Sequence, residues 1–199
     1  MNKEQIAKLS ALKAELLTVN WKQQVSHAKQ NKVIRAYLIG LYQLISSDYS
    51  LGRNEFGQLF LLEADTEQSA RKRISQLQSG AWLEDGEIFA VLNSLGMNVN
   101  ITADYQFAGH DRNRQMAAMA QASPFEVRPK APVAEIQNHS NVHWTPLGQQ
   151  VRGDGNCGVY TIAAIMKQNY EYIAGVNANN KTFSKRRVEK DNGQLIEVK

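Results

Sequence analysis

One cysteine lies in a glycine-rich turn directly before an apolar helical segment. The turn is Gly153-Asp154-Gly155-Asn156-Cys157-Gly158, and the apolar segment follows it over residues 159–166. A thiol at a helix start lies near unpaired backbone N–H groups and the positive end of the helix dipole, and both favour the reactive thiolate. The same N–H groups can bind a developing oxyanion. The pattern predicts a nucleophilic Cys157, and the alternative is a buried cysteine without chemistry.

A histidine suited to act as general base precedes this cysteine by fourteen positions (157 − 143). The segment Asn141-Val142-His143-Trp144-Thr145 alternates polar and apolar residues. Read as a strand, it places Asn141, His143 and Thr145 on one face and the two apolar residues on the other. A general base needs a partner that orients its ring, and either Asn141 or Thr145 is close enough along the strand. The alternative is a surface histidine on a half-buried strand.

Composition places the chain among ordinary globular proteins. Its 199 residues are 43% hydrophobic and 21% charged, which suits one domain, or one domain with an extension, with a core of its own. A single cysteine cannot form an internal disulfide, so the fold does not depend on an oxidising compartment. No apolar run approaches the roughly 20 residues that span a bilayer, and the charged N-terminus does not have the pattern of a signal peptide. We expect no membrane partner.

The net charge of +4 is mild, and basic residues gather near the C-terminus. The cluster is Lys181, Lys185, Arg186, Arg187 and Lys190. Such a cluster can contact nucleic acid, but more often it is a solvated tail. Aromatic residues do not alternate with it apart from one phenylalanine, so we expect no nucleic-acid partner. The four histidines and one cysteine lack the spacing of zinc ligands, so we expect no metal and no cofactor.

Hydrophobic periodicity predicts helices joined to a small sheet. Asp85 is expected to cap a helix that runs from Gly86 or Glu87 to about Leu95, where Gly96 ends it. A helix, a glycine stop and a strand form one step of a layered α+β domain, with a small β-sheet flanked by helices. The other expected helices cover 3–20, 31–46, 54–62, 66–78 (capped by Thr66) and 158–173. The expected strands cover 99–102, 134–137 and 142–145, with a turn at 138–140, a long loop at 103–132, and at most an edge strand at 195–198.

These segments together resemble the OTU (ovarian tumour) family of cysteine proteases, which are deubiquitinases. Asp154-Gly155-Asn156-Cys157 followed by a helix is similar to the family's nucleophile motif. The segment from Gly80 to Asp85, with its tryptophan, the helix to Leu95 and the strand at 99–101, resembles the family's Trp-containing turn, helix and strand. His143-Trp144 resembles its His-aromatic pair. The resemblance covers roughly residues 66–172.

The order of the motifs differs from that of the family, which usually places the nucleophile first and the histidine last. A circular permutation accounts for the difference, because only the seven residues 146–152 are needed to join the histidine strand to the cysteine loop. The resemblance implies one catalytic domain over 1–199 with a papain-like core and permuted OTU topology. Its parts are an N-terminal helical part at 1–65, a catalytic core at 66–175 and a polar tail at 176–199.

The resemblance also implies roles for individual residues. Cys157 is the expected nucleophile and His143 the expected base, with Asp154, Gly155 and Asn156 forming the oxyanion loop. Trp144 is expected either to wall a substrate channel or to pack under the strand. Gly158 replaces a bulkier family residue, and Thr145 stands where many members have an acidic or amide residue. We therefore expect Asn141 to orient the histidine, with Thr145 and Asn138 as alternatives.

Ubiquitin or polyubiquitin is the partner that the resemblance implies, with hydrolysis of isopeptide bonds at the C-terminal glycine of ubiquitin. Two alternatives remain: a protease of the SUMO-protease and adenovirus-protease class, whose motif order matches without permutation, and a non-enzymatic ubiquitin-binding module. The first places an acidic residue and a glutamine on separate elements between histidine and cysteine, for which fourteen positions leave little room. A thiolate enzyme is expected to act in the cytosol, and a bacterial one would be secreted into a host cell.

Overall fold

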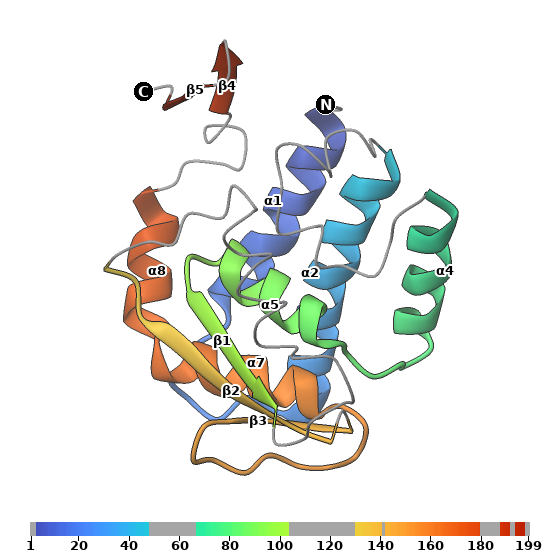
Figure 1. Ribbon diagram of the computed structural model, residues 1–199, viewed down its shortest axis with the longest axis vertical. Coiled ribbons are helices and arrows are strands. Elements are labelled where there is room, and N and C mark those ends of the chain that lie inside the picture. The colour runs from blue at the N-terminus through green and yellow to red at the C-terminus, as the bar shows by residue number, and fades with distance from the viewer. Residues whose placement is uncertain are drawn as a thin grey trace.

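The computed structural model describes residues 3–47, 67–103, 130–140, 142–179, 188–191 and 194–197. Over these residues the chain is an α+β protein, with six helices, a three-stranded sheet and a separate hairpin. In the view of Figure 1, α1, α2 and α4 lie to the right of the strands and α8 lies to the left, next to α7. The helices are α1 (Lys3–Thr18), α2 (His27–Ser47), α4 (Glu67–Gln78), α5 (Asp85–Ser94), α7 (Cys157–Gln168) and α8 (Tyr170–Asn179). The strands are β1 (Asn98–Ala103), β2 (Val133–His139), β3 (His143–Pro146), β4 (Val188–Asp191) and β5 (Gln194–Glu197).

The main sheet has the order β1-β2-β3. Strand β1 pairs with β2 in parallel, and β2 pairs with β3 in antiparallel fashion. His139 is the register partner of His143, and Asn138 is the register partner of Trp144. Because successive side chains alternate between the faces of a sheet, the two histidines share one face while Asn138 and Trp144 share the other.

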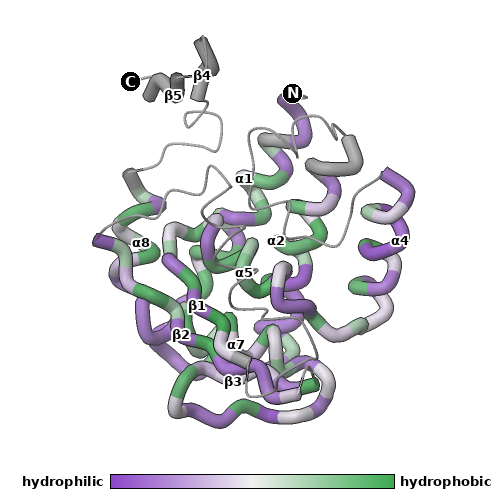
Figure 2. The backbone as a smooth tube through the Cα atoms, in the orientation of Figure 1, coloured by the Kyte–Doolittle hydropathy of each residue, from purple (hydrophilic) through white to green (hydrophobic). Residues whose placement is uncertain are grey.

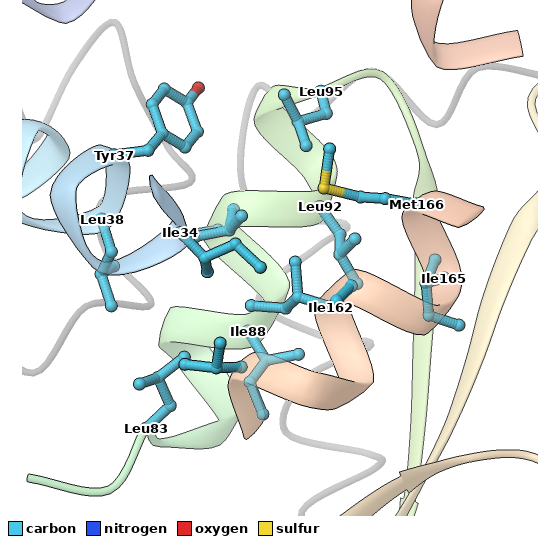
Figure 3. Close-up of a cluster of buried hydrophobic side chains, with 14 of the residues drawn as sticks. Ile34, Tyr37, Leu38, Leu83, Ile88, Leu92, Leu95, Ile162, Ile165 and Met166 are labelled. Atoms are coloured by element: carbon cyan, nitrogen blue, oxygen red, sulfur yellow. The ribbon is translucent and has the colours of Figure 1, made fainter. Parts of the chain in front are cut away.

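The core forms where α2, α5 and α7 meet behind the sheet. Figure 3 shows Ile34 of α2, Ile88 and Leu92 of α5, and Ile162 of α7 gathered where the three helices meet. All of these side chains are buried. In Figure 2 the helix α5 is mainly hydrophobic and α4 mainly hydrophilic, in keeping with α4 burying only Ala70 and Leu77 along its inner face. Burial of this apolar surface fixes α7, and therefore its first residue, against the sheet.

A capping box begins α5 and differs from the expected cap. The N-cap is Glu84, whose side chain and that of Glu87 form reciprocal hydrogen bonds with the backbone. The expectation that Asp85 caps this helix is wrong, because Asp85 is its first helical residue and its carboxylate accepts hydrogen bonds from the sheet. The expected end at Gly96 is confirmed: Gly96 follows the C-cap Leu95 with a φ of 103°.

Other boundaries also differ from expectation. The helix expected at 158–173 divides at Asn169, whose φ of −116° and ψ of 23° end α7 before α8 begins. The turn expected at 138–140 is shorter, since β2 continues through His139 and the chain turns at Ser140 with a φ of 54°. Residues 188–191 and 194–197 pair as a hairpin where at most an edge strand was expected. The helix expected at 54–62, the cap at Thr66, most of the long loop and residues 181–187 of the basic tail lie outside the described residues.

Within the part of the chain that the structure describes, no helix combines the length and the apolar character needed to cross a membrane.

Candidate functional site

Cys157 is the first residue of α7 and is 2% exposed. Its helix is held close to the segment before α5: a Cβ atom on Gly158 would lie 2.9 Å from Cβ of Leu83 and 3.3 Å from Cδ1 of Ile88. The next turn is tied to the sheet, because the Thr161 hydroxyl donates a hydrogen bond of 2.8 Å to the Trp144 carbonyl. The thiol is therefore placed at a buried helix start whose position is fixed by both the sheet and α5.

Asp154 organises the loop in front of Cys157. Its carboxylate accepts a hydrogen bond of 3.1 Å from the backbone N–H of Asn156 and one of 2.9 Å from the Tyr160 hydroxyl. Arg152 lies 3.2 Å from the same carboxylate. Desolvation raises the pKa of Asp154, but the hydrogen bonds from Tyr160 and Asn156 and the charge of Arg152 outweigh it, so the pKa lies below its ordinary value. Asp154 is thus an ionised residue that shapes the loop.

Gly155 brings the loop against an exposed tryptophan. Its φ is +87°, a conformation that glycine adopts without strain. A Cβ atom at this position would lie 2.6 Å from Nε1 of Trp82. Only glycine satisfies both the conformation and the close approach. Trp82 is 50% exposed, so an indole surface open to solvent borders the loop that leads to Cys157.

His143 opens β3 and lies beside the same loop. A Cβ atom on Gly153 would lie 3.7 Å from Cε1 and 3.8 Å from Nδ1 of the His143 ring, so the imidazole packs against the loop four residues before the cysteine. The ring is partly exposed. Two elements that are consecutive in the chain, β3 and α7, thereby bring the predicted base to the predicted nucleophile's loop.

The three residues considered for orienting His143 have different surroundings. The Thr145 hydroxyl lies 2.9 Å from Nε2 of His139. Asn138 is fully buried on the opposite face of the sheet, where its amide donates to Asp85. This position rules out Asn138 as the partner of His143. Asn141 lies outside the described residues.

Trp144 has the packing role. It is 2% exposed, and its indole N–H donates to the buried Asp85 carboxylate. The expectation that Trp144 walls a substrate channel is therefore replaced by its alternative, packing under the strand. Among the described residues near the cysteine loop, the tryptophan with an exposed ring is Trp82.

A polar stripe on α2 supports the loop and was missed by sequence reasoning. The ring of His27 stacks on Tyr160 at a centroid distance of 4.2 Å. Arg35 donates a hydrogen bond of 3.2 Å to Asn31 and one of 2.8 Å to the side chain of Asn156. The spacing of four between His27, Asn31 and Arg35 indicates one helix face, but nothing in the sequence connects that face to a loop more than 100 positions away.

A second histidine, His139, was also missed. Its ring centroid lies 5.9 Å from that of His143, across the β2–β3 pairing. The signal that could have identified it is the antiparallel pairing itself, which makes residues 139 and 143 neighbours once the turn is placed at residue 140 rather than over 138–140.

Among the described residues, no group of three or more histidine, cysteine, aspartate or glutamate side chains is placed to hold a metal ion. Comparison of the chain with protein-family models, curated proteins and solved structures found no match. The chemistry and geometry of the residues described above are therefore the basis of the function proposed below.

Proposed function

We propose that this protein is a cysteine-dependent deubiquitinase that hydrolyses isopeptide bonds at the C-terminal glycine of ubiquitin. The observation that carries the proposal is the placement of the His143 imidazole against Gly153, in the loop that ends in Cys157 at the first position of α7. A thiol at a helix start beside a histidine is the arrangement that activates a cysteine nucleophile. The choice of ubiquitin rests on the resemblance of these segments to the OTU family.

The proposed reaction has two steps. The sulfur of Cys157 attacks the carbonyl carbon of ubiquitin's C-terminal glycine while His143 takes the thiol proton. The tetrahedral intermediate collapses with loss of the lysine amine, which His143 protonates. Water then hydrolyses the thioester, releasing ubiquitin with a free carboxylate and restoring the thiol. Backbone N–H groups of the loop and of the start of α7 are the proposed donors to the oxyanion.

The burial of Cys157 bears on the substrate. A cysteine that is 2% exposed favours a tail without side chains, because a diglycine end needs the least room to reach its thiol. The exposed face of Trp82 next to Gly155 offers an apolar surface at the approach to the loop. Both features support a flexible diglycine tail as the segment that enters.

The proposed core is papain-like with permuted OTU topology. Its support is a cysteine at the start of a buried helix, α7, that packs against the strand carrying the histidine, β3. The rival SUMO-protease class would need an acidic residue on a further strand between the two. All residues from 147 to 156 are described and none of them lies in a strand. This favours the OTU reading over the rival class. We propose that the protein acts in the cytosol, and that a bacterial protein of this kind would act in the cytosol of a host cell.

The test is hydrolysis of ubiquitin that carries a fluorogenic amide at its C-terminus. Replacement of the nucleophile (Cys157→Ser) or of the base (His143→Ala) is expected to lower kcat by at least about 10³-fold while the thermal midpoint stays unchanged. His139→Ala is the matched control, because its ring lies beside that of His143 on the neighbouring strand. Loss of activity in the control but not in His143→Ala would overturn the assignment of the base.

The same assay separates the remaining alternatives. Asn141→Ala is expected to lower kcat by about 10- to 100-fold if Asn141 orients His143, whereas Thr145→Val would do so if the threonine does. Hydrolysis of a SUMO substrate in place of ubiquitin would move the protein to the rival class. Binding of ubiquitin without hydrolysis would support the non-enzymatic module.

A further inference from the structure

Arg35 contacts the residue directly before the nucleophile. Its Nη2 donates a hydrogen bond of 2.8 Å to Oδ1 of Asn156. Its Nη1 donates bonds of 2.8 Å to the carbonyl of Ala81 and 3.2 Å to that of Leu77, and its Nε donates to Asn31. Every nitrogen of the guanidinium is engaged, so Arg35 fixes the position of the Asn156 side chain relative to α2 and to the turn before Trp82.

The hydrogen bond from Arg35 keeps the Asn156 side chain from capping the N-terminus of α7. Asn156 is the N-cap residue of α7, and asparagine is favoured there because its side-chain oxygen accepts a hydrogen bond from the N–H of the second or third helical residue. In this chain the Asn156 side chain makes no such cap bond. Its oxygen accepts from Arg35 instead.

The missing cap leaves backbone N–H groups at the start of α7 without an acceptor in the described part of the chain. The second and third residues of this helix are Gly158 and Val159, and no described residue accepts a hydrogen bond from their N–H groups. N–H groups without partners at a helix start favour negative charge nearby, and the thiol of Cys157 is the group next to them. A conventional cap by Asn156 would occupy one of these donors.

We propose that Arg35 is a positioning residue that draws the Asn156 side chain away from the cap of α7 and so keeps the N–H groups of Gly158 and Val159 free for the Cys157 thiolate and the oxyanion. The inference rests on the proposed function and deepens it, by naming the group that prepares the helix start for chemistry. Arg35 acts through Asn156, without touching substrate.

The test measures thiolate absorbance at 240 nm as a function of pH, with the matching Cys157→Ser protein subtracted. Cys157 is the only cysteine, so the remaining signal belongs to it. In Arg35→Met the freed Asn156 oxygen is expected to cap α7, moving the midpoint of the thiolate signal upward by about one pH unit. Asn156→Ala alone removes the side chain that could cap the helix and leaves the donors free as they are in the wild type, so the midpoint is expected to stay at its wild-type position.

The double variant Arg35→Met with Asn156→Ala decides the matter. It has lost the same Arg35 contacts as the single variant but has no side chain to cap the helix, so the midpoint is expected to return most of the way to the wild-type position. A midpoint as high as that of Arg35→Met would mean that the charge of Arg35 acts directly, and would overturn the proposal. So would an Arg35→Met protein with an unshifted midpoint.

A fallback variant and a separate activity assay keep the role of Arg35 testable. If Arg35→Met does not fold, Arg35→Lys preserves the charge but not the forked geometry, and restoration of its midpoint by Asn156→Ala tests the same point. No ubiquitin is present in the titration. The expected midpoints combined with inactivity towards ubiquitin would therefore reject the proposed substrate alone, whereas activity without the expected midpoints would reject the role of Arg35 alone.

Discussion

The indole nitrogen of Trp82 lies 2.6 Å from the position that a Cβ atom on Gly155 would occupy. This contact joins the turn before α5 to the loop before Cys157. It leaves no space for a side chain at residue 155, whose φ of +87° already disfavours one. The turn and the loop therefore hold one another in place beside the thiol.

Gly155→Ala is expected to displace the Trp82 ring and the loop together, lowering both stability and thiol-dependent activity. The strained φ and the steric overlap together cost about 1–3 kcal/mol, and activity should fall more than about tenfold because the loop is displaced. Chemical denaturation and turnover of a ubiquitin substrate measure the two effects.

Gly148→Ala is the matched control for this change. Gly148 has a comparable φ of +74°, but nothing lies within 4 Å of a Cβ atom placed there. It should lose stability through backbone strain and keep its activity. Equal loss of activity in both variants would mean that the contact with Trp82 is unimportant.

Gly158→Ala tests the packing of the nucleophile helix. Alanine normally stabilises a helix relative to glycine by about 0.5–1 kcal/mol. At residue 158 a Cβ atom would lie 2.9 Å from Cβ of Leu83, so we expect a loss of about 1–3 kcal/mol in the free energy of unfolding. Gly175→Ala in α8, where nothing lies within 4 Å, should show the ordinary gain. A gain at residue 158 as well would refute the close contact between α7 and Leu83.

Arg73 and Glu87 form an ion pair whose removal should be costly. The Glu87 side chain is fully buried, and it accepts hydrogen bonds from Arg73, from Tyr42 and from the backbone N–H of Glu84. The hydrogen bond with Glu87 raises the pKa of Arg73, in keeping with a tightly held pair. Arg73→Met leaves a buried carboxylate without its cation, and unfolding measurements should show a loss of about 3–5 kcal/mol.

The neighbouring Arg71 provides the comparison. It pairs with Glu67 on the same helix, but both side chains are more than half exposed. Arg71→Met should change the free energy of unfolding by no more than about 0.5 kcal/mol. Similar losses for the two arginines would show that burial does not set the difference.

The ionised Asp154 predicts a pH dependence in the loop. Because the pKa in the folded protein lies below the ordinary value of 3.8, the loop contributes its stability fully above that value and loses it as the pH falls through the folded pKa. A carboxyl carbon titration by NMR should place the Asp154 midpoint below 3.8. Tyr160→Phe removes a donor while keeping the ring, and should raise the midpoint. An unchanged midpoint would exclude the Tyr160 hydrogen bond as a cause.

Local patterns were enough to predict the elements that carry the site. The glycine-rich turn followed by apolar residues predicted a helix at Cys157, and alternation predicted a strand at His143; both are present. The glycine stop at Gly96 was also predicted, because a left-handed residue after a helix is a local requirement.

Long-range contacts could not be predicted in the same way. Arg35 lies 121 positions from Asn156, and the pairing of His139 with His143 depends on where one turn begins. The burial of Trp144 also depends on a long-range contact, because the buried Asp85 carboxylate accepts a hydrogen bond from its indole N–H. Trp82 is the tryptophan whose ring is exposed. The break between α7 and α8 at Asn169 could not be predicted either, because asparagine is only moderately unfavourable in helices and no stronger helix-breaking residue stands there.

The most direct measurement is intact mass after incubation with ubiquitin that carries a C-terminal electrophile. The account predicts that the wild-type protein gains the mass of one ubiquitin and that His143→Ala gains it much more slowly. Cys157→Ala should gain none, because it lacks the only thiol of the chain. A wild-type protein that stays unmodified by ubiquitin and SUMO probes alike, while remaining folded, would contradict the assignment of a cysteine protease.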